Sequence, residues 1–296
     1  MTRVAAVDPG NEALLERHRR RGQQVLLGLS APALLTLMVV VFLPVFWLSS
    51  LSLLDRSGSL TAENYARIFQ SELYLGTFVV TFQISVAVTL LCALLGYPLS
   101  YWMARLPPGR AAICMVFVLV PFWTSVLVRT YAWLVLLQRN GLVNQALQAL
   151  GLVDEPLQLA HNLTGSIIGM VHIMLPFMVL PLYASMKAID QDAVRAAVGL
   201  GATPARAFRD VFFPMSLPGL FAGVVLVFVL SLGFFVTPAL LGGGRVQMLA
   251  QRIESTITIY SNWGAASALG VVLLAATLAL VWVLHRVFGL DRLFAR

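Results

Sequence analysis

Six long apolar runs constrain the fold of this 296-residue chain more than any other feature. A helix needs about 20 apolar residues to cross the roughly 30 Å hydrocarbon core of a bilayer. Hydrophobic residues make up 59% of the chain and charged residues 11%, which excludes an ordinary soluble domain. The sequence therefore predicts an all-α integral membrane protein with six transmembrane helices. The runs cover residues 25–54, 76–104, 111–138, 164–187, 217–241 and 266–288.

The first run is expected to remain in the mature protein, although it follows the basic stretch "RHRRRG". It is much longer than the apolar core of a secretory signal, and no small-residue cleavage site closes it. We therefore expect a short polar tail over residues 1–24, a six-span domain over 25–289 and a C-terminal tail over 290–296.

The distribution of basic residues predicts the orientation. The net charge is +7, but the positive charges alternate by loop rather than forming one patch for nucleic acid. With the N-terminus in the cytoplasm, 14 of the 20 basic residues fall on the inner side and five on the outer side. This bias satisfies the positive-inside rule and predicts that both termini are cytoplasmic.

One polar segment, "DQDAVRAAVGLGATPARAFRDVFFPMSLPGL" over residues 190–220, has its own helical pattern. Residues 190–200 form a predicted helix, Gly201 ends it, and Thr203 with Pro204 begins a second helix. An amphipathic hairpin lying on the inner membrane surface fits this pattern. A protruding element that docks a cytoplasmic subunit fits it as well, and periodicity alone leaves both open.

The segment resembles the cytoplasmic "EAA" loop of permease subunits of binding-protein-dependent ABC importers. Its spacing is complete, but Arg195 occupies the place where the family usually has glutamate. The resemblance implies that this loop, over about 188–216, couples the chain to an ATPase. The residues that carry it are Arg195, Ala196, Ala197, Gly201, Val211 and Pro214.

Further motifs extend the resemblance over nearly the whole chain. The stretches "PFWTSVLVRTYAWLVLLQRNGLVNQALQALGL" from Pro121 and "FFVTPALLGGGRVQMLAQRIE" from Phe234 are similar to permeases of the polyamine group, the spermidine and putrescine type. "LTAENYARIF" and "LLGYPLSYWMAR" are similar to the same group. The resemblance implies a type I importer fold in a bacterial inner membrane and a polyamine as substrate.

The resemblance also implies the partners. They are a second, non-identical permease subunit, two cytoplasmic ATPase subunits, a periplasmic substrate-binding protein and membrane lipid, without nucleic acid. ATP and magnesium are expected in the ATPase subunits and no cofactor in this chain, which lacks the G-x-x-x-x-G-K-[ST] sequence. The four histidines lack metal-ligand spacing, so no metal site or catalytic residue is expected.

Residues inside the spans are the candidates for contact with substrate. Aromatic rings can hold an amine by cation–π contact, although helix packing or a membrane-interface belt is the more common role of any single ring. Arg129 is a charge inside a span, and on a straight third helix it would lie near the outer boundary. There, extension toward the interface or bonding to carbonyls of a partner explains it without a functional role. If it faces the pathway instead, it suits a carboxylate. His172 is a further polar candidate. The aromatic candidates are Trp123, Tyr131, Trp133, Tyr183, Phe234 and Phe235.

Two other classes of function remain for comparison. An ion-coupled secondary transporter usually keeps an acidic residue at membrane depth, whereas all 13 acidic residues here lie outside the predicted spans. A membrane-embedded enzyme would need a catalytic cluster, and none is apparent. Within the importer class, an opine, an amino-acid-like compound or another small organic ion is the alternative to a polyamine.

Overall fold

The computed structural model describes residues 9–55 and 58–288 and shows an entirely helical fold in these ranges, which confirms the predicted class. The predicted C-terminal tail and residues 1–8 lie outside the described residues, while residues 9–24 are helical and continuous with the first span. The α-helices are α1 (Pro9–Leu51), α2 (Glu63–Gln70), α3 (Glu72–Arg105), α4 (Pro108–Leu119), α5 (Val126–Leu137), α6 (Leu142–Ala149), α7 (Leu163–Ala188), α8 (Gln191–Gly199), α9 (Pro204–Ala207), α10 (Phe213–Leu232), α11 (Val236–Leu241), α12 (Leu249–Thr258) and α13 (Trp263–Phe288).

Five helices in the described ranges are long and apolar enough to cross a membrane, and a bent pair of helices brings the number to six if the pair counts as one span. The broken pair, Pro108–Trp123 and Val126–Ala149, bends by 97° and corrects the expectation of one continuous helix over 111–138. The chain passes through the 3₁₀ turn η1 (Val120–Trp123) and then becomes extended at Thr124. Pro121 lies in that turn and has no N–H for a helical hydrogen bond, which favours the break.

The fifth predicted run, 217–241, is also divided. Helix α10 ends at Leu232, and the short α11 begins at Val236. Pro238 explains the gap, because its ring would clash with the carbonyl of residue 234 if the helix continued. The upstream end differs as well, since α9 and the π-helical turn η2 (Phe208–Phe212) lead directly into α10.

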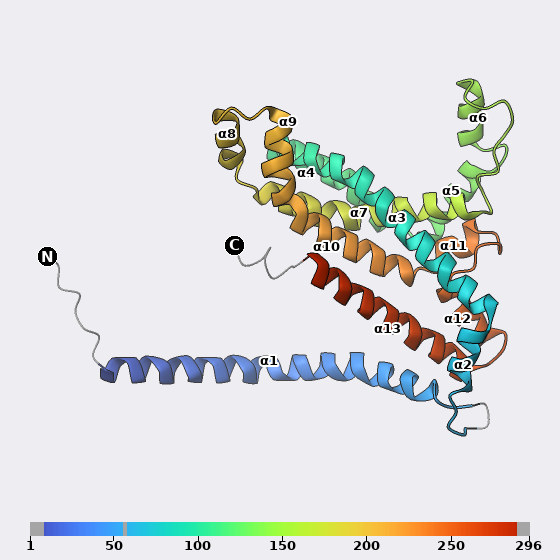
Figure 1. The fold of residues 1–296 in the computed structure, drawn as a ribbon, viewed down its shortest axis with the longest axis horizontal. Coiled ribbons are helices and arrows are strands. Elements are labelled where there is room, and N and C mark those ends of the chain that lie inside the picture. The colour runs from blue at the N-terminus through green and yellow to red at the C-terminus, as the bar shows by residue number, and fades with distance from the viewer. Residues whose placement is uncertain (1–8, 56–57, 289–296) are drawn as a thin grey trace.

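Helices α3, α7 and α10 form the centre of the molecule (Figure 1). Along α7, Met170, Met174 and Met178 are buried at intervals of four residues, so they follow one face of the helix. Small residues on the neighbouring helices allow this close packing. A Cβ atom added at Gly223 would lie 2.6 Å from the Met178 Sδ.

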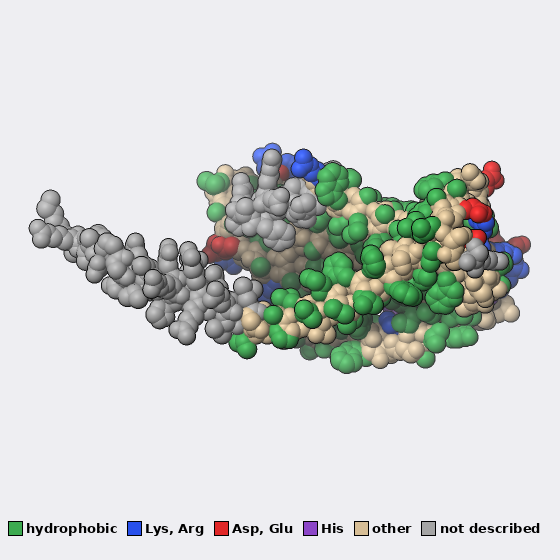
Figure 2. Space-filling view, turned by 90° about the horizontal axis from the view of Figure 1, so that it is seen from below, with side chains coloured by type: hydrophobic (Ala, Val, Ile, Leu, Met, Phe, Trp, Pro, Cys, Tyr) green, Lys and Arg blue, Asp and Glu red, His purple; other side chains and the backbone are tan. Residues whose placement is uncertain are grey.

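Helix α1 stands apart from this centre, and the C-terminal end of α1 packs against α13 (Figure 1). From Leu29 to Leu48 the apolar side chains of α1 are exposed, as Phe46 and Trp47 illustrate. Figure 2 shows apolar side chains over the middle of one face, with most charged side chains toward the ends. This arrangement suits contact with lipid and with other membrane subunits.

The two ends of the molecule carry different elements. Helices α8 and α9 project at one end, where α1 begins and α13 ends (Figure 1). The opposite end carries α2, α6 and α12, which lie in or beside the medium-sized segments between spans. The expected short helix after Thr61 is present as α2, and the Thr61 hydroxyl accepts a hydrogen bond from the Glu63 N–H at 3.0 Å.

Candidate functional site

The projecting hairpin α8–α9 is built by local signals, and the predicted stop at Gly201 and cap at Thr203 are both present. The Asp190 carboxylate accepts a hydrogen bond from the Asp192 N–H at 2.9 Å and begins α8. Gly201 ends it with φ +92°, while the Ala202 N–H donates to the Ala197 carbonyl at 3.1 Å, as in a Schellman motif. The Thr203 hydroxyl accepts from the Arg206 N–H at 3.3 Å and begins the second helix.

The outer surface of α8 is open in this single chain. Arg195 forms an ion pair with Asp192 at 3.2 Å, and the Arg195 side chain is 79% exposed to solvent. Val198 and Leu200 are also exposed, Leu200 at 90%. Val194 faces the other way and packs against the main core. The hairpin is therefore anchored through one face of α8. The other face exposes alanine side chains, the apolar residues Val198 and Leu200, and the ion pair between Arg195 and Asp192.

The six predicted coupling residues fall in three places on this hairpin. Arg195, Ala196 and Ala197 lie on α8, and Gly201 forms the turn. Val211 lies in η2, and Pro214 in the first turn of α10. The last two are therefore at the base of the hairpin, where it continues into a span.

Three of the predicted substrate-path residues come together in the interior. The Trp133 indole N–H donates to the His172 Nδ1 at 2.9 Å, which joins α5 to α7. Arg129 lies one turn before Trp133 on α5 and is 9% exposed. Its Nε and Nη1 atoms are buried and have no hydrogen-bond partner among the described residues.

The position of Arg129 corrects the expectation of a straight third helix. Because the chain bends by 97° between Trp123 and Val126, Arg129 belongs to the first turn of a new helix rather than to the far end of the old one. Its neighbour Thr130 hydrogen-bonds Thr237 of α11 at 3.1 Å, so this part of α5 faces the interior. Two of the three guanidinium nitrogens, Nε and Nη1, are thus buried, and burial of a charge is unfavourable without an anion or carbonyl groups beside it.

The other aromatic candidates do not form one site with these residues. Trp123 is 88% exposed in η1, and Tyr131 is exposed on the outer side of α5. Phe234 packs against the main core, whereas Phe235 is exposed and Tyr183 is half-buried. Among the described residues, no ring contact joins these five side chains to one another.

A hollow of about 360 Å³ lies between α3, α4 and α7 and was not predicted. Trp102, Cys114, Phe117, Pro121 and His172 contribute to its wall. Trp102 and Phe117 were missed because each is one aromatic residue in a long apolar run, where periodicity gives no sign of a hollow. Two residues of the wall stood out in the sequence, the candidate His172 and the proline at the helix break, Pro121.

The comparisons with known proteins agree with this geometry. The family model of the binding-protein-dependent transport system inner membrane component matches residues 96–289. The chain is 34% identical over 254 residues to the spermidine/putrescine transport system permease protein PotB of Haemophilus influenzae, covering 83% of this chain and 88% of the relative. Identity to PotB of Escherichia coli K12 is 32%, with 83% and 92% covered.

A solved structure gives the corresponding fold. A bacterial alginate ABC transporter, crystallised in complex with an alginate pentasaccharide-bound periplasmic protein, contains a chain with a TM-score of 0.71. The superposition covers 90% of this chain and 94% of the other, at 16% identity. At this identity the likeness concerns the fold alone.

Proposed function

The chain belongs to the family of binding-protein-dependent transport system inner membrane components, and we propose that it forms half of a pathway for a polyamine such as spermidine or putrescine. It is a multi-pass inner-membrane permease subunit of an ABC importer and not an enzyme. The observation that supports a polyamine as the substrate is the similarity to two spermidine/putrescine permeases over most of the chain.

The α8–α9 hairpin supports a role in energy coupling. It projects from one end of the helices, its outer face is open, and its base continues without interruption into α10. In our proposal it docks on the cytoplasmic ATPase subunits, which bind ATP and magnesium. Closure of the ATPase dimer then moves the hairpin and, through it, the spans.

The other end suits the delivery of substrate. Helices α2, α6 and α12 gather there, and Arg139 and Arg245 lie in the loops beside them. We place the periplasmic binding protein at this end. The exposed apolar faces of α1 and of the bent pair α4 and α5 then contact lipid and a second, non-identical permease subunit. The second subunit completes the pathway.

Exposed aromatic side chains can contact a cation, although no acidic residue lies inside the predicted spans. A ring holds an ammonium group by about 0.5–2 kcal/mol, depending on desolvation. Trp123, Tyr131 and the rings that line the hollow, Trp102 and Phe117, are exposed in this single chain. They are therefore available to a substrate or to the second permease.

Arg129 favours a second candidate, a small organic ion that carries an acidic group. Its Nε and Nη1 atoms, which have no hydrogen-bond partner in the described part of the chain, suit a carboxylate or a phosphonate, and the charge repels an ammonium group. An opine or an amino-acid-like compound has such a group and is the alternative substrate.

Uptake into proteoliposomes separates the two substrates. The complex of this chain, the second permease and the ATPases is reconstituted with ATP inside and the loaded binding protein outside. We expect labelled spermidine or putrescine to accumulate and unlabelled polyamine to compete. Accumulation of amino-acid-like anions, with no polyamine uptake, would overturn the polyamine proposal and support the alternative.

A further inference from the structure

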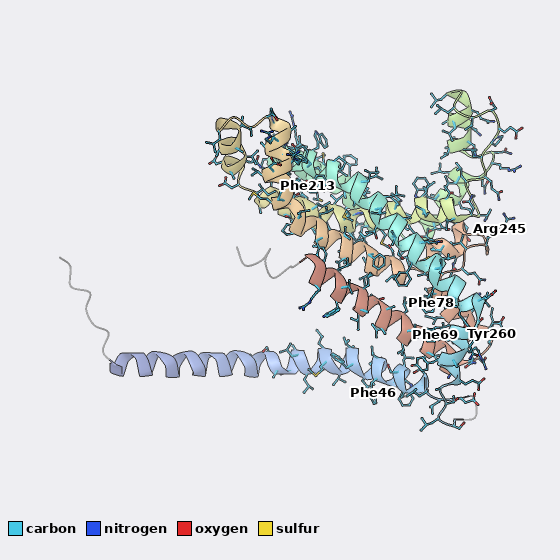
Figure 3. The ribbon with its side chains drawn as sticks, viewed as in Figure 1. Phe46, Phe69, Phe78, Phe213, Arg245 and Tyr260 are labelled. Carbon is cyan, nitrogen blue, oxygen red and sulfur yellow. The ribbon has the colours of Figure 1, made fainter. Side chains whose placement is uncertain are left out.

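A cluster of aromatic rings fastens the base of the hairpin to a helix that is distant in the sequence. Tyr101 of α3 lies edge-on to Phe208, with ring centroids 5.2 Å apart, and to Phe212, at 5.0 Å. Tyr97, one turn earlier on α3, lies 5.8 Å from Phe213. Its hydroxyl forms a hydrogen bond of 2.8 Å with that of Ser216. Figure 3 labels Phe213 at this junction.

The backbone at this junction is unusual. Residues Phe208–Phe212 form a π-helical turn between α9 and α10, a conformation that occurs mostly as single turns and often at functional sites. The rings of Phe208 and Phe212 are stacked, with centroids 5.7 Å apart and planes inclined by 18°. The Tyr101 ring packs against both members of this stack.

A cation completes the arrangement. The Arg105 guanidinium carbon lies 4.0 Å from the centroid of the Tyr101 ring, one turn further along α3. Phe212 is buried, whereas Arg105 is exposed at the edge of the cluster. We call Tyr101, Arg105, Phe208 and Phe212 the aromatic clamp.

The clamp gives the hairpin a second mechanical connection. The chain itself joins the hairpin to α10, while the clamp joins it to α3, which packs along both α7 and α10. A displacement of α8 and α9 relative to the spans must therefore either move α3 or break the ring contacts. Movement of α3 with the hairpin is favoured, because edge-to-face ring pairs and cation–π contacts both depend strongly on geometry.

We propose that Tyr101 and Arg105 are positioning residues that transmit the motion of the hairpin to α3 during transport. The inference rests on the proposed docking of the hairpin on the ATPases, and it concerns the step after docking. Transport therefore depends on two helices, α3 and α10, that follow the hairpin together.

The test measures substrate transported per ATP hydrolysed in the reconstituted complex. For Tyr101→Leu, which loses both ring contacts and the cation–π contact, we expect this ratio to fall at least about fivefold. For Arg105→Gln, which changes an exposed side chain, we expect a fall of about twofold to fivefold. Tyr101→Phe keeps the ring and should retain the ratio, as should Arg105→Lys.

Trp282→Leu is the matched control, because it removes an exposed ring from α13, away from the clamp. Co-purification of the ATPases with each variant is measured in parallel. A structural role alone would lower the amount of complex and leave the ratio unchanged. If Tyr101→Leu and Arg105→Gln both transported as much substrate per ATP as the wild type, the proposed role of the aromatic clamp would be overturned.

If Tyr101→Leu fails to assemble, Arg105→Gln decides the matter, since its side chain is exposed. The controls also separate this inference from the proposed function. A wild-type chain that does not bind ATPases at all would contradict the proposed function. If the wild-type chain transports substrate and the clamp variants have the same ratio of substrate to ATP, only the proposed role of the aromatic clamp is contradicted.

Discussion

At the scale of single residues, Arg195 is the clearest departure from the loop pattern that this chain resembles. The usual residue there is glutamate, and a docked arginine needs a carboxylate or carbonyl partner instead. In the single chain it is paired with Asp192, but both side chains are about 80% exposed. An exposed ion pair contributes little stability, so Arg195 can exchange this partner on docking at small cost.

Arg195→Glu should therefore reduce uptake. The new carboxylate would lie beside Asp192 and opposite a surface that accepts an arginine, so like charges meet. We expect uptake in membranes with matched amounts of protein to fall about tenfold, the order expected from the loss of one charge-assisted contact. Arg195→Lys, the control, should retain most of the activity. Equal uptake in all three chains would show that Arg195 makes no important contact.

Arg129 permits a prediction about both stability and substrate. Its buried Nε and Nη1 atoms lack partners in the described residues, so Arg129→Met should leave the melting temperature unchanged or raise it. If the substrate is a polyamine, uptake should persist, because a repulsive charge has been removed. Abolished uptake with normal folding would indicate that Arg129 binds an acidic group of the substrate or of a partner.

At the scale of elements, the turn of the hairpin has a simple conformational requirement. Gly201 has φ +92°, and a Cβ atom added there would meet no atom within 4 Å. A larger residue is therefore opposed by backbone strain rather than by a clash. For non-glycine residues this strain is on the order of 1–2 kcal/mol, and β-branched residues tolerate it poorly.

Gly201→Val should consequently distort the hairpin and reduce both uptake and stimulated ATP hydrolysis severalfold, with normal amounts of chain in the membrane. Gly199→Ala is the matched control, since Gly199 is helical and equally free of neighbours. Alanine there should be neutral or stabilising by about 0.5–1 kcal/mol. Full activity of Gly201→Val in a transport assay would exclude a coupling role for this turn.

Local signals explain why the hairpin could be predicted in such detail. The caps at Asp190 and Thr203 and the glycine at 201 act within a few residues, so the sequence specifies them without knowledge of the rest. The break at Pro121 was less predictable, because proline inside a span can bend a helix or merely kink it. Neighbouring helices determine which occurs.

Features that depend on packing between distant segments were not predictable. The edge-to-face contacts between Tyr101 and the rings of the π turn at 208–212 join residues about 110 positions apart. The burial of Arg129 depends on the position of α5 against α7 and α11. The apolar pattern indicates which residues avoid water, but in lipid it does not indicate which helix each face contacts.

At the scale of the whole molecule, the proposed function assigns energy coupling to one end of the chain and substrate delivery to the other. The spans α3, α7 and α10 connect them, and α1 remains outside this core (Figure 1). A single permease subunit of this shape leaves many apolar faces uncovered. The proposed assembly, with a second permease in the membrane and ATPases at the hairpin, accounts for these faces.

ATP hydrolysis by the assembled complex is the decisive measurement for the proposed role of this chain. The purified chain alone should hydrolyse no ATP, because the nucleotide is expected to bind in the partner subunits. With its ATPases and second permease it should form a stable complex whose hydrolysis rises when the loaded binding protein is added. ATPase activity in the isolated chain, or a complex that ignores the loaded binding protein, would contradict the assignment of a coupled permease subunit.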